Sequence, residues 1–167
     1  TNAAFGQYTI SNVVYNNDGV FSLAVDALSY ANGIAVSNDT NFIYVAESIG
    51  KSLSIYSHDF SNGELKFNQS IFMNSALDNI DIDINGNIWI ATHPQLISFT
   101  RNLKNKNNPF PSQVFKLSSM GIQEYSNEEI YLNLGEQISG ISVAAVYDDH
   151  LLIGSVFEDY FLHCKLK

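Results

Sequence analysis

The sequence has 167 residues and a mass of 18.6 kDa, which is enough for one domain with a sizeable buried core. Hydrophobic residues make up 46% and charged residues 15%, a composition that excludes a disordered tail, and the sequence contains no apolar run long enough to predict a membrane span. Eight Lys and Arg against 17 Asp and Glu give a net charge of −9, which repels nucleic acid and anionic membrane surfaces. We therefore expect a densely packed, soluble domain that does not bind nucleic acid.

Apolar and polar residues alternate with a period of two through most of the chain, and no helical window of convincing length interrupts them. This pattern predicts an all-β fold made of short strands rich in Ile, Val, Tyr and Phe. The predicted strands are 8–15, 21–27, 34–37, 42–46, 53–57, 80–84, 88–92, 96–99, 114–117, 129–132, 142–147, 151–156 and 160–165.

Short segments rich in Asn, Asp, Ser and Gly separate many of these strands, and such residues favour tight turns. We predict hairpin turns at 17–19, 37–41, 61–63, 85–87 and 148–149. The segment 101–111 contains Lys, Asn and two prolines, so we expect an exposed connection there and not a central strand.

An internal repeat organises the strands. The unit at 32–56 is echoed at 78–99 and, more weakly, at 141–164, and the equivalent residues Ile34 and Ile80 are 46 positions apart. This period is close to the roughly 40–50 residues of one four-stranded blade of a β-propeller. At that length the chain supplies about three to four blades, whereas closed propellers have about four to eight. We therefore expect about half a ring, which a companion segment must complete.

The repeat aligns oxygen-bearing side chains at the start of the innermost strands, which converge on the axis of a propeller. Asn32 and Asp78 are equivalent, and Asn79 follows the second. Such oxygens suit a hard cation such as calcium, although these residue types are also ordinary turn formers. Asp81 and Asp83 are predicted to face solvent or a neighbouring polar layer and not a metal.

Several segments, in order along the chain, resemble the C-terminal half of the paraoxonase/arylesterase family of calcium-dependent lactonases. The resemblance implies a six-bladed propeller with two central calcium ions that hydrolyses lactones or aryl esters. Residues 1–167 would be the C-terminal half of one propeller domain, completed by a separate N-terminal polypeptide. The segments are Tyr-Ala-Asn-Gly-Ile at 30–34, Tyr-Val-Ala-Glu at 44–47, Leu-Asp-Asn-Ile at 77–80, Thr-His-Pro at 92–94, Leu-Leu-Ile-Gly-Ser-Val-Phe at 151–157 and the terminal Cys164.

The same resemblance implies roles for individual residues. Asn32, Asp78 and Asn79 map onto ligands of the catalytic calcium, which polarises the substrate carbonyl and stabilises the oxyanion. His93 is a candidate catalytic residue, although a histidine at a strand end equally often bonds the backbone. The remaining calcium ligands and the main acid–base residues belong to the other half. The candidate substrate-binding residues are Ser48, His93, Val156 and Phe157, although core packing is the commoner role of residues such as the last two. Thr92 and Glu158 depart from the family pattern, which often has cysteine and histidine at these positions.

The single cysteine and two sequons bear on the compartment. Cys164 is either a buried free thiol or one half of a bridge to another chain. The family resemblance implies the bridge, since its disulfide joins the last strand to the N-terminal region. Asn38 and Asn68 begin Asn-X-Ser/Thr sequons, so they are candidate glycosylation sites, and we expect a secreted or lumenal protein.

The sequence is also compatible with two other functions. A propeller similar to the strictosidine-synthase-like proteins would keep calcium for stability and bind a ligand without hydrolysing it. Alternatively, Thr1 would act as an N-terminal nucleophile activated by its own amine. His58, His150 and His163 lie in predicted turns or in the terminal strand, and the sequence assigns them no role.

Overall fold

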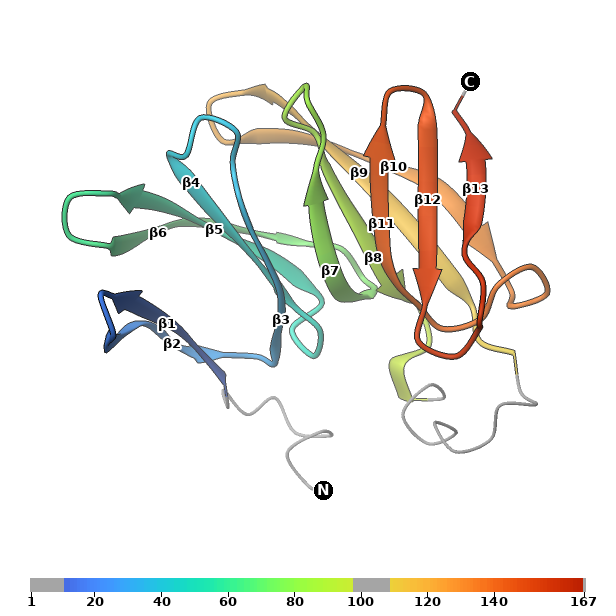
Figure 1. Cartoon of the computed structure of the whole chain (residues 1–167), viewed down its shortest axis with the longest axis horizontal. Coiled ribbons are helices and arrows are strands. Elements are labelled where there is room, and N and C mark those ends of the chain that lie inside the picture. Colours follow the sequence, from blue (N-terminus) through green and yellow to red (C-terminus); the bar gives the residue numbers. More distant parts are fainter. Residues whose placement is uncertain (1–10, 98–108, 167) are drawn as a thin grey trace.

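The computed structural model describes residues 11–97 and 109–166, and within these ranges the chain forms thirteen strands in four antiparallel sheets. The predicted all-β class is confirmed. The four sheets lie side by side (Figure 1). No helix in these ranges is long and apolar enough to cross a membrane.

The first sheet is the hairpin of β1 (Ser11–Asn17) and β2 (Val20–Leu28). Two four-stranded blades follow, each with its strands in sequence order from the inner to the outer edge. The first contains β3 (Ala31–Val36), β4 (Phe42–Glu47), β5 (Ser52–Asp59) and β6 (Glu64–Phe72). The second contains β7 (Ala76–Ile82), β8 (Ile88–His93), β9 (Ser112–Gly121) and β10 (Glu124–Asn133).

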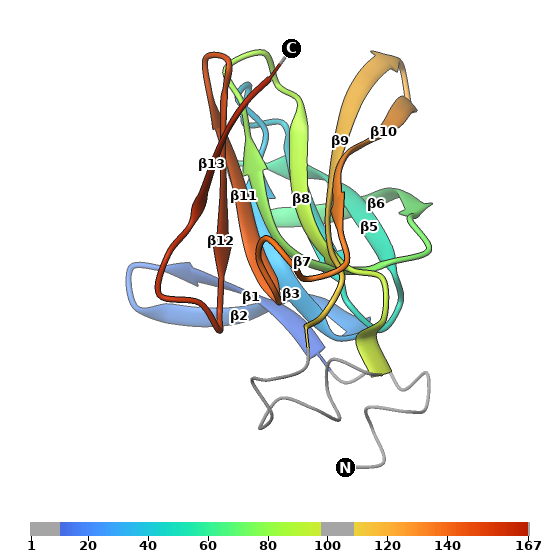
Figure 2. The same ribbon diagram turned by 90° about the vertical axis from the view of Figure 1, so that its right-hand side faces the viewer.

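The last sheet has three strands, β11 (Ile141–Tyr147), β12 (His150–Ser155) and β13 (Leu162–Lys165). Its first strand, β11, lies beside β7, and β7 in turn lies beside β3. Figures 1 and 2 show these three inner strands next to one another, with the remaining strands of each sheet extending outward. The repeat therefore corresponds to blades of a β-propeller, as the sequence predicts.

The hydrophobic core lies between the blades. Leu53, Leu77 and Ile88 belong to a cluster between the first and second blades, and Trp89 and Leu151 belong to one between the second and third. Every residue of β8 is buried because this strand has a blade on each side, which explains its nearly uninterrupted apolar sequence. Packing of blade on blade thus aligns the starts of β3 and β7.

The hairpin turns lie where the sequence predicts them. Left-handed backbone conformations occur at Gly19 (φ 89°), Gly63 (φ 75°) and Gly86 (φ 80°), and also at Thr40 and Asp148. A left-handed φ suits glycine because it has no Cβ to clash with the backbone. The turns that contain Thr40, Gly86 and Asp148 join the inner and second strands of the last three sheets, which pair antiparallel.

One predicted strand is wrong, and one observed strand has no counterpart in the prediction. The segment 96–99 is predicted as a strand, but Leu96 and Ile97 are helical, and 98–99 lie outside the described residues. Pro94 follows β8 directly and favours a helical turn over a return strand, so the third strand of this blade is β9. Strand β6 is an outer strand whose apolar residues are interrupted by the polar run at 68–70, so a continuous alternation does not reveal it.

The connection after β8 differs in part from the prediction. Residues 101–108 lie outside the described residues, but Phe110 is only 4% exposed and its N–H donates to Ser139 Oγ at 2.8 Å. The end of this connection is therefore packed against the protein and is not wholly exposed.

Candidate functional site

The starts of β3 and β7 meet at one end of the blades, at the bottom of Figure 1. Gly33 makes this contact possible, because a Cβ at this position would lie 2.4 Å from the backbone oxygen of Asp78 and 2.9 Å from the Cα of Asn79. Asn32, the residue before Gly33, and Asp78 therefore lie on two backbones in direct contact. The structure brings together the two positions that the repeat makes equivalent.

A buried serine joins the two strands. The Ser48 side chain follows β4, and its hydroxyl donates to the backbone oxygen of Leu77 at 2.5 Å and accepts the Asn32 Nδ2–H at 3.2 Å. Ser48 is only 5% exposed. Because the Ser48 hydroxyl bonds both Leu77 and Asn32, it fixes the orientation of the Asn32 amide relative to Leu77, the residue directly before Asp78. The predicted contact of Ser48 with substrate stays a prediction.

His93 ends β8 and reaches back to β7. Its Nε2 lies 3.1 Å from Asp78 Oδ2, and the histidine is only 4% exposed. Residues 76 and 93 are register partners, so the antiparallel pairing of β7 and β8 brings these side chains together. A carboxylate and a buried imidazole in contact can hold or exchange a proton.

Asn79 faces the third inner strand. Its Nδ2 donates to the backbone oxygen of Ser142 on β11 at 2.9 Å. Asn32, Asp78 and Asn79 thus span the contacts among β3, β7 and β11, with Asn79 joined to β11.

These side chains fit part of a calcium shell. The hydrogen bonds described above use Nδ2 of both asparagines and Oδ2 of Asp78, and Oδ1 of each residue is an oxygen of the kind that calcium takes in proteins. Calcium takes about six to eight oxygens, which exceeds this supply. Within the described residues, no group of three or more His, Cys, Asp or Glu side chains is arranged to hold an ion.

Val156 and Phe157 follow β12 at the same end of the blades. Val156 is 58% exposed, and its N–H donates to the backbone oxygen of Gly140 at 3.2 Å. The ring of Phe157 packs 5.9 Å from that of Phe110. Their position suits an apolar wall, and their contact with substrate stays a prediction.

Glu47 belongs to one of the motifs in the sequence but has no predicted role. Its Oε2 accepts the Ser29 N–H at 2.6 Å and its Oε1 accepts the Ser54 hydroxyl at 2.5 Å. Glu47 is buried and fixes the end of β4 directly before Ser48. A glutamate that ends an apolar strand was the available signal for this role.

Asp81 and Asp83 accept hydrogen bonds from other parts of the protein. Asp81 Oδ2 accepts the Val146 N–H at 3.3 Å, as expected for a neighbouring polar layer. Asp83 is 7% exposed, and its carboxylate accepts hydrogen bonds from Trp89 Nε1 and from the turn residues Asn85 and Asn87. Burial alone would raise the pKa of Asp83, but these hydrogen bonds outweigh it and lower the pKa.

The remaining predicted residues lie away from this cluster. Cys164 is unpaired and packs partly buried against the core between the second and third blades, so its bond to another polypeptide stays a prediction. Asn38 lies in a turn, and its Nδ2 donates to the backbone oxygen of Asp83. Asn68 lies half-buried on β6. Thr1 lies outside the described residues.

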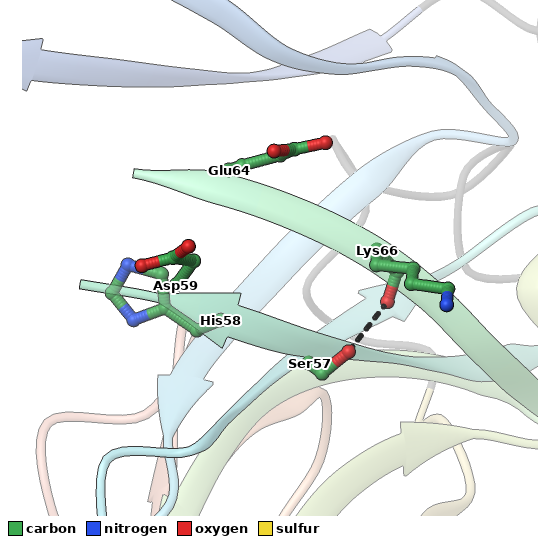
Figure 3. A pocket seen from close by; sticks show the side chains of 5 residues that line it. All are labelled: Ser57, His58, Asp59, Glu64 and Lys66. Atoms are coloured by element: carbon green, nitrogen blue, oxygen red, sulfur yellow. Dashed lines mark hydrogen bonds between the residues drawn. The ribbon is translucent and has the colours of Figure 1, made fainter. Parts of the chain in front are cut away.

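A pocket of about 260 Å³ lies on the outer edge of the first blade, away from these residues. Figure 3 shows its lining side chains on β5 and β6, with the Ser57 hydroxyl donating to the backbone oxygen of Lys66 at 3.3 Å. His58 and Asp59 lie together at one side, and Glu64 lies across from them. None of the predicted site residues lines this pocket.

Comparisons with known proteins agree with this arrangement. A sequence model of the arylesterase family matches residues 5–166. Human serum paraoxonase/arylesterase 1 is 30% identical over 157 residues, which are 93% of this chain and 43% of that protein. The chain thus spans less than half the length of this relative.

Two solved structures share the fold. A gluconolactonase from Xanthomonas campestris superposes with a TM-score of 0.58 at 14% identity, over 91% of this chain and 49% of its own. The calcium-binding protein regucalcin from Agrobacterium tumefaciens superposes with a TM-score of 0.55 at 15% identity, over 89% of this chain and 46% of its own. The fold is that of a six-bladed β-propeller, of which this chain supplies about three to three and a half blades. The family match over nearly the whole chain shows that it belongs to the paraoxonase/arylesterase family.

Proposed function

We propose that this chain is the C-terminal half of a calcium-dependent hydrolase of lactones or aryl esters. The observation that carries the proposal is the junction of β3 and β7, where Asn32 and Asp78 meet around buried Ser48 and His93. Membership in the arylesterase family supports the same reaction class.

Asn32, Asp78 and Asn79 would hold the ion through their Oδ1 atoms. A bound calcium ion supplies positive charge to the ester carbonyl oxygen, where negative charge develops during hydrolysis. One carboxylate and two neutral amides neutralise only part of a divalent charge, which favours polarisation of a carbonyl. Ser48 keeps the Asn32 amide from rotating, because its hydroxyl is held by Leu77.

His93 is the proposed proton-handling residue of this half. Hydrolysis joins the oxygen of water to the carbonyl carbon, breaks the ester C–O bond and moves one proton from water to the leaving oxygen. His93 Nε2 lies 3.1 Å from Asp78 Oδ2, so a proton held between these two atoms would lie at the same strand ends as the proposed calcium ligands. Burial shields this pair from bulk water, which strengthens their interaction.

We also propose that a separate N-terminal polypeptide completes the ring, joined through a disulfide at Cys164 in the secretory pathway. Within the described residues the last sheet has three strands and the first has two, whereas the two blades between them have four each, and this difference supports an incomplete ring. An intact-mass measurement with and without reductant tests this part: a mass that falls on reduction is expected, and an unchanged mass would contradict the bridge.

The hydrolase proposal is tested by initial rates on phenyl acetate and on a δ-lactone, with calcium and after its removal by a chelator. We expect activity that disappears with the chelator and returns with calcium. Asp78→Ala should abolish it, whereas Asp81→Ala, a matched change on the same strand, should retain it because Asp81 bonds Val146 and not this cluster.

Two outcomes would count against hydrolysis. Full turnover by Asp78→Ala would show that Asp78 takes no part in the reaction. Calcium that raises the melting temperature of the protein without any turnover of either substrate would favour the ligand-binding propeller instead.

A further inference from the structure

Two histidines lie together on the last sheet. They lie at the opposite end of the blades from Asp78. His150 begins β12 and His163 lies on β13. His150 pairs with Lys165 and Leu152 pairs with His163, so the two histidines are diagonal neighbours on one face of the antiparallel pair. His150 Nδ1 lies 2.6 Å from His163 Nε2, and the ring centroids are 4.7 Å apart.

A carboxylate orients the first of these rings. His150 Nε2 lies 3.1 Å from Asp149 Oδ1, and Lys165 Nζ lies 3.2 Å from the other oxygen of Asp149. When His150 donates through Nε2, its Nδ1 carries a lone pair, and that atom faces His163. A carboxylate behind a histidine is the arrangement that orients metal-binding imidazoles in proteins.

We propose that His150 Nδ1 and His163 Nε2 form a two-imidazole site for a divalent metal of the copper(II) or nickel(II) class, positioned by Asp149. Imidazole nitrogens suit such metals, whereas calcium prefers oxygen. Water completes the coordination, because the described residues contain no group of three or more His, Cys, Asp or Glu side chains placed around one point.

The spacing of the nitrogens favours a right-angled site. With metal–nitrogen bonds of about 2.0–2.1 Å, two ligands at a right angle are about 2.9 Å apart, and two tetrahedral ligands are about 3.3 Å apart. The observed 2.6 Å is nearer to the first value. The side chain of His150 is 44% exposed, so its ring can move by the few tenths of an ångström that separate the observed nitrogen–nitrogen distance from that of a right-angled site.

The neighbouring cysteine is not a ligand of this site. Cys164 lies between His163 and Lys165 in sequence, so its side chain points to the other face of β13. There it packs with the core between the second and third blades, as does Leu151. A bond from Cys164 to another chain therefore leaves both imidazoles in place.

The test is an isothermal titration of the full-length protein, free of any polyhistidine tag, with Ni²⁺ at pH 7.5 in millimolar calcium. Nickel is chosen because, unlike copper(II), it is not reduced by a thiol. His163→Phe keeps the ring but removes the nitrogen, and should weaken binding of one nickel ion by about a hundredfold because the chelate is lost. His150→Phe should have the same effect.

Two further variants separate the role of the carboxylate from that of the ion pair. Asp149→Asn should weaken nickel binding by about tenfold. Lys165→Met removes the ion pair between Lys165 and Asp149 but keeps the contact of Asp149 with His150, and should leave nickel binding unchanged. Both imidazole variants should keep the wild-type melting temperature and hydrolytic rate.

Equal nickel affinity in wild-type protein and His163→Phe would overturn the site. Equal losses in Asp149→Asn and Lys165→Met would overturn the positioning role of Asp149. Neither result depends on hydrolysis, since the histidine pair and Asp78 lie at opposite ends of the blades.

Discussion

The two complete blades carry different chemistry at the same backbone position. On β3 the residue is Asn32, a neutral amide held by the hydroxyl of Ser48. On β7 it is Asp78, a carboxylate held by the imidazole of His93. Equivalent positions in a repeat thus supply proposed ligands of different charge, and the support behind each side chain matches its charge.

The next residue differs for a related reason. Gly33 has no side chain because the backbone of β7 occupies the space where a Cβ would lie. Its equivalent, Asn79, carries a side chain long enough to reach Ser142 on β11. The spacing of the inner strands therefore selects a small residue at one junction and a bridging residue at the other.

The largest effect is expected when the two charges are exchanged. Asn32→Asp combined with Asp78→Asn conserves net charge, yet calcium-dependent turnover should fall by about 10²–10³-fold, as when one charge-stabilising group is lost. The carboxylate introduced on β3 would face the oxygen of Ser48, whose proton is committed to Leu77, and His93 would face an amide. Initial rates on phenyl acetate at saturating calcium measure this.

Activity near the wild-type level in the exchanged protein would show that only the total charge matters. Asp78→Asn alone is the control, because it removes the charge without supplying another. We expect it to be as inactive as the exchange.

Replacement of the imidazole behind Asp78 should have the next largest effect. His93→Gln can still donate a hydrogen bond to Asp78 but cannot exchange a proton near neutral pH, so kcat should fall by about a hundredfold. A variant that keeps its kcat would limit His93 to positioning Asp78.

Much of this fold follows from local pattern. The 46-residue repeat identified the blade, and Asn and Gly residues marked the turns. Strand β6 was not predicted because the polar run at 68–70, where its pairing with β5 shifts register, breaks the alternation of its apolar residues. The error at 96–99 has the opposite cause: Leu96 and Ile97 are apolar, but the chain turns after Pro94 and pairs β8 with a strand about twenty residues further on.

The site was predictable where it depends on the repeat. Aligned positions identified Asn32 and Asp78, and the structure places their backbones in contact. The family resemblance named Ser48 and His93 as candidate site residues, but their hydrogen bonds to Asn32 and Asp78 cross strands, and no local pattern encodes those partners. The histidine pair on β12 and β13 was not predicted for the same reason, since it depends on a diagonal register.

Stability offers a second comparison between the blades, at their turns. Asp83 in the second blade is buried and accepts the indole N–H of Trp89, whereas Asp39 in the first blade is exposed and bonds only within its own turn. Asp83→Asn should lower the free energy of unfolding by about 2 kcal/mol, the range for hydrogen bonds to a charged group. Asp39→Asn should change it by less than about 0.5 kcal/mol. Urea unfolding at pH 7 measures both.

The pH dependence of this difference has a definite sign. The pKa of Asp83 is lowered in the folded protein, so its stabilisation is complete above the unfolded value and is lost as the pH falls through the folded one. The gap between wild-type protein and Asp83→Asn should therefore narrow below about pH 4. A gap that is constant from about pH 7 to about pH 3 would mean that charge does not contribute.

The smallest effect is expected at the hydroxyl that supports Asn32. Ser48→Ala leaves the Nδ2 of Asn32 and the oxygen of Leu77 without this partner, and should raise the calcium concentration at half-maximal activity by about tenfold, or about 1.4 kcal/mol. Ser54→Ala is the matched control, because Ser54 is equally buried in the same blade but bonds Glu47. It should destabilise the blade without shifting the calcium midpoint. Equal shifts in both variants would mean that Ser48 acts through general stability, whereas a shift confined to Ser48→Ala would mean that the orientation of one amide sets the affinity of the site.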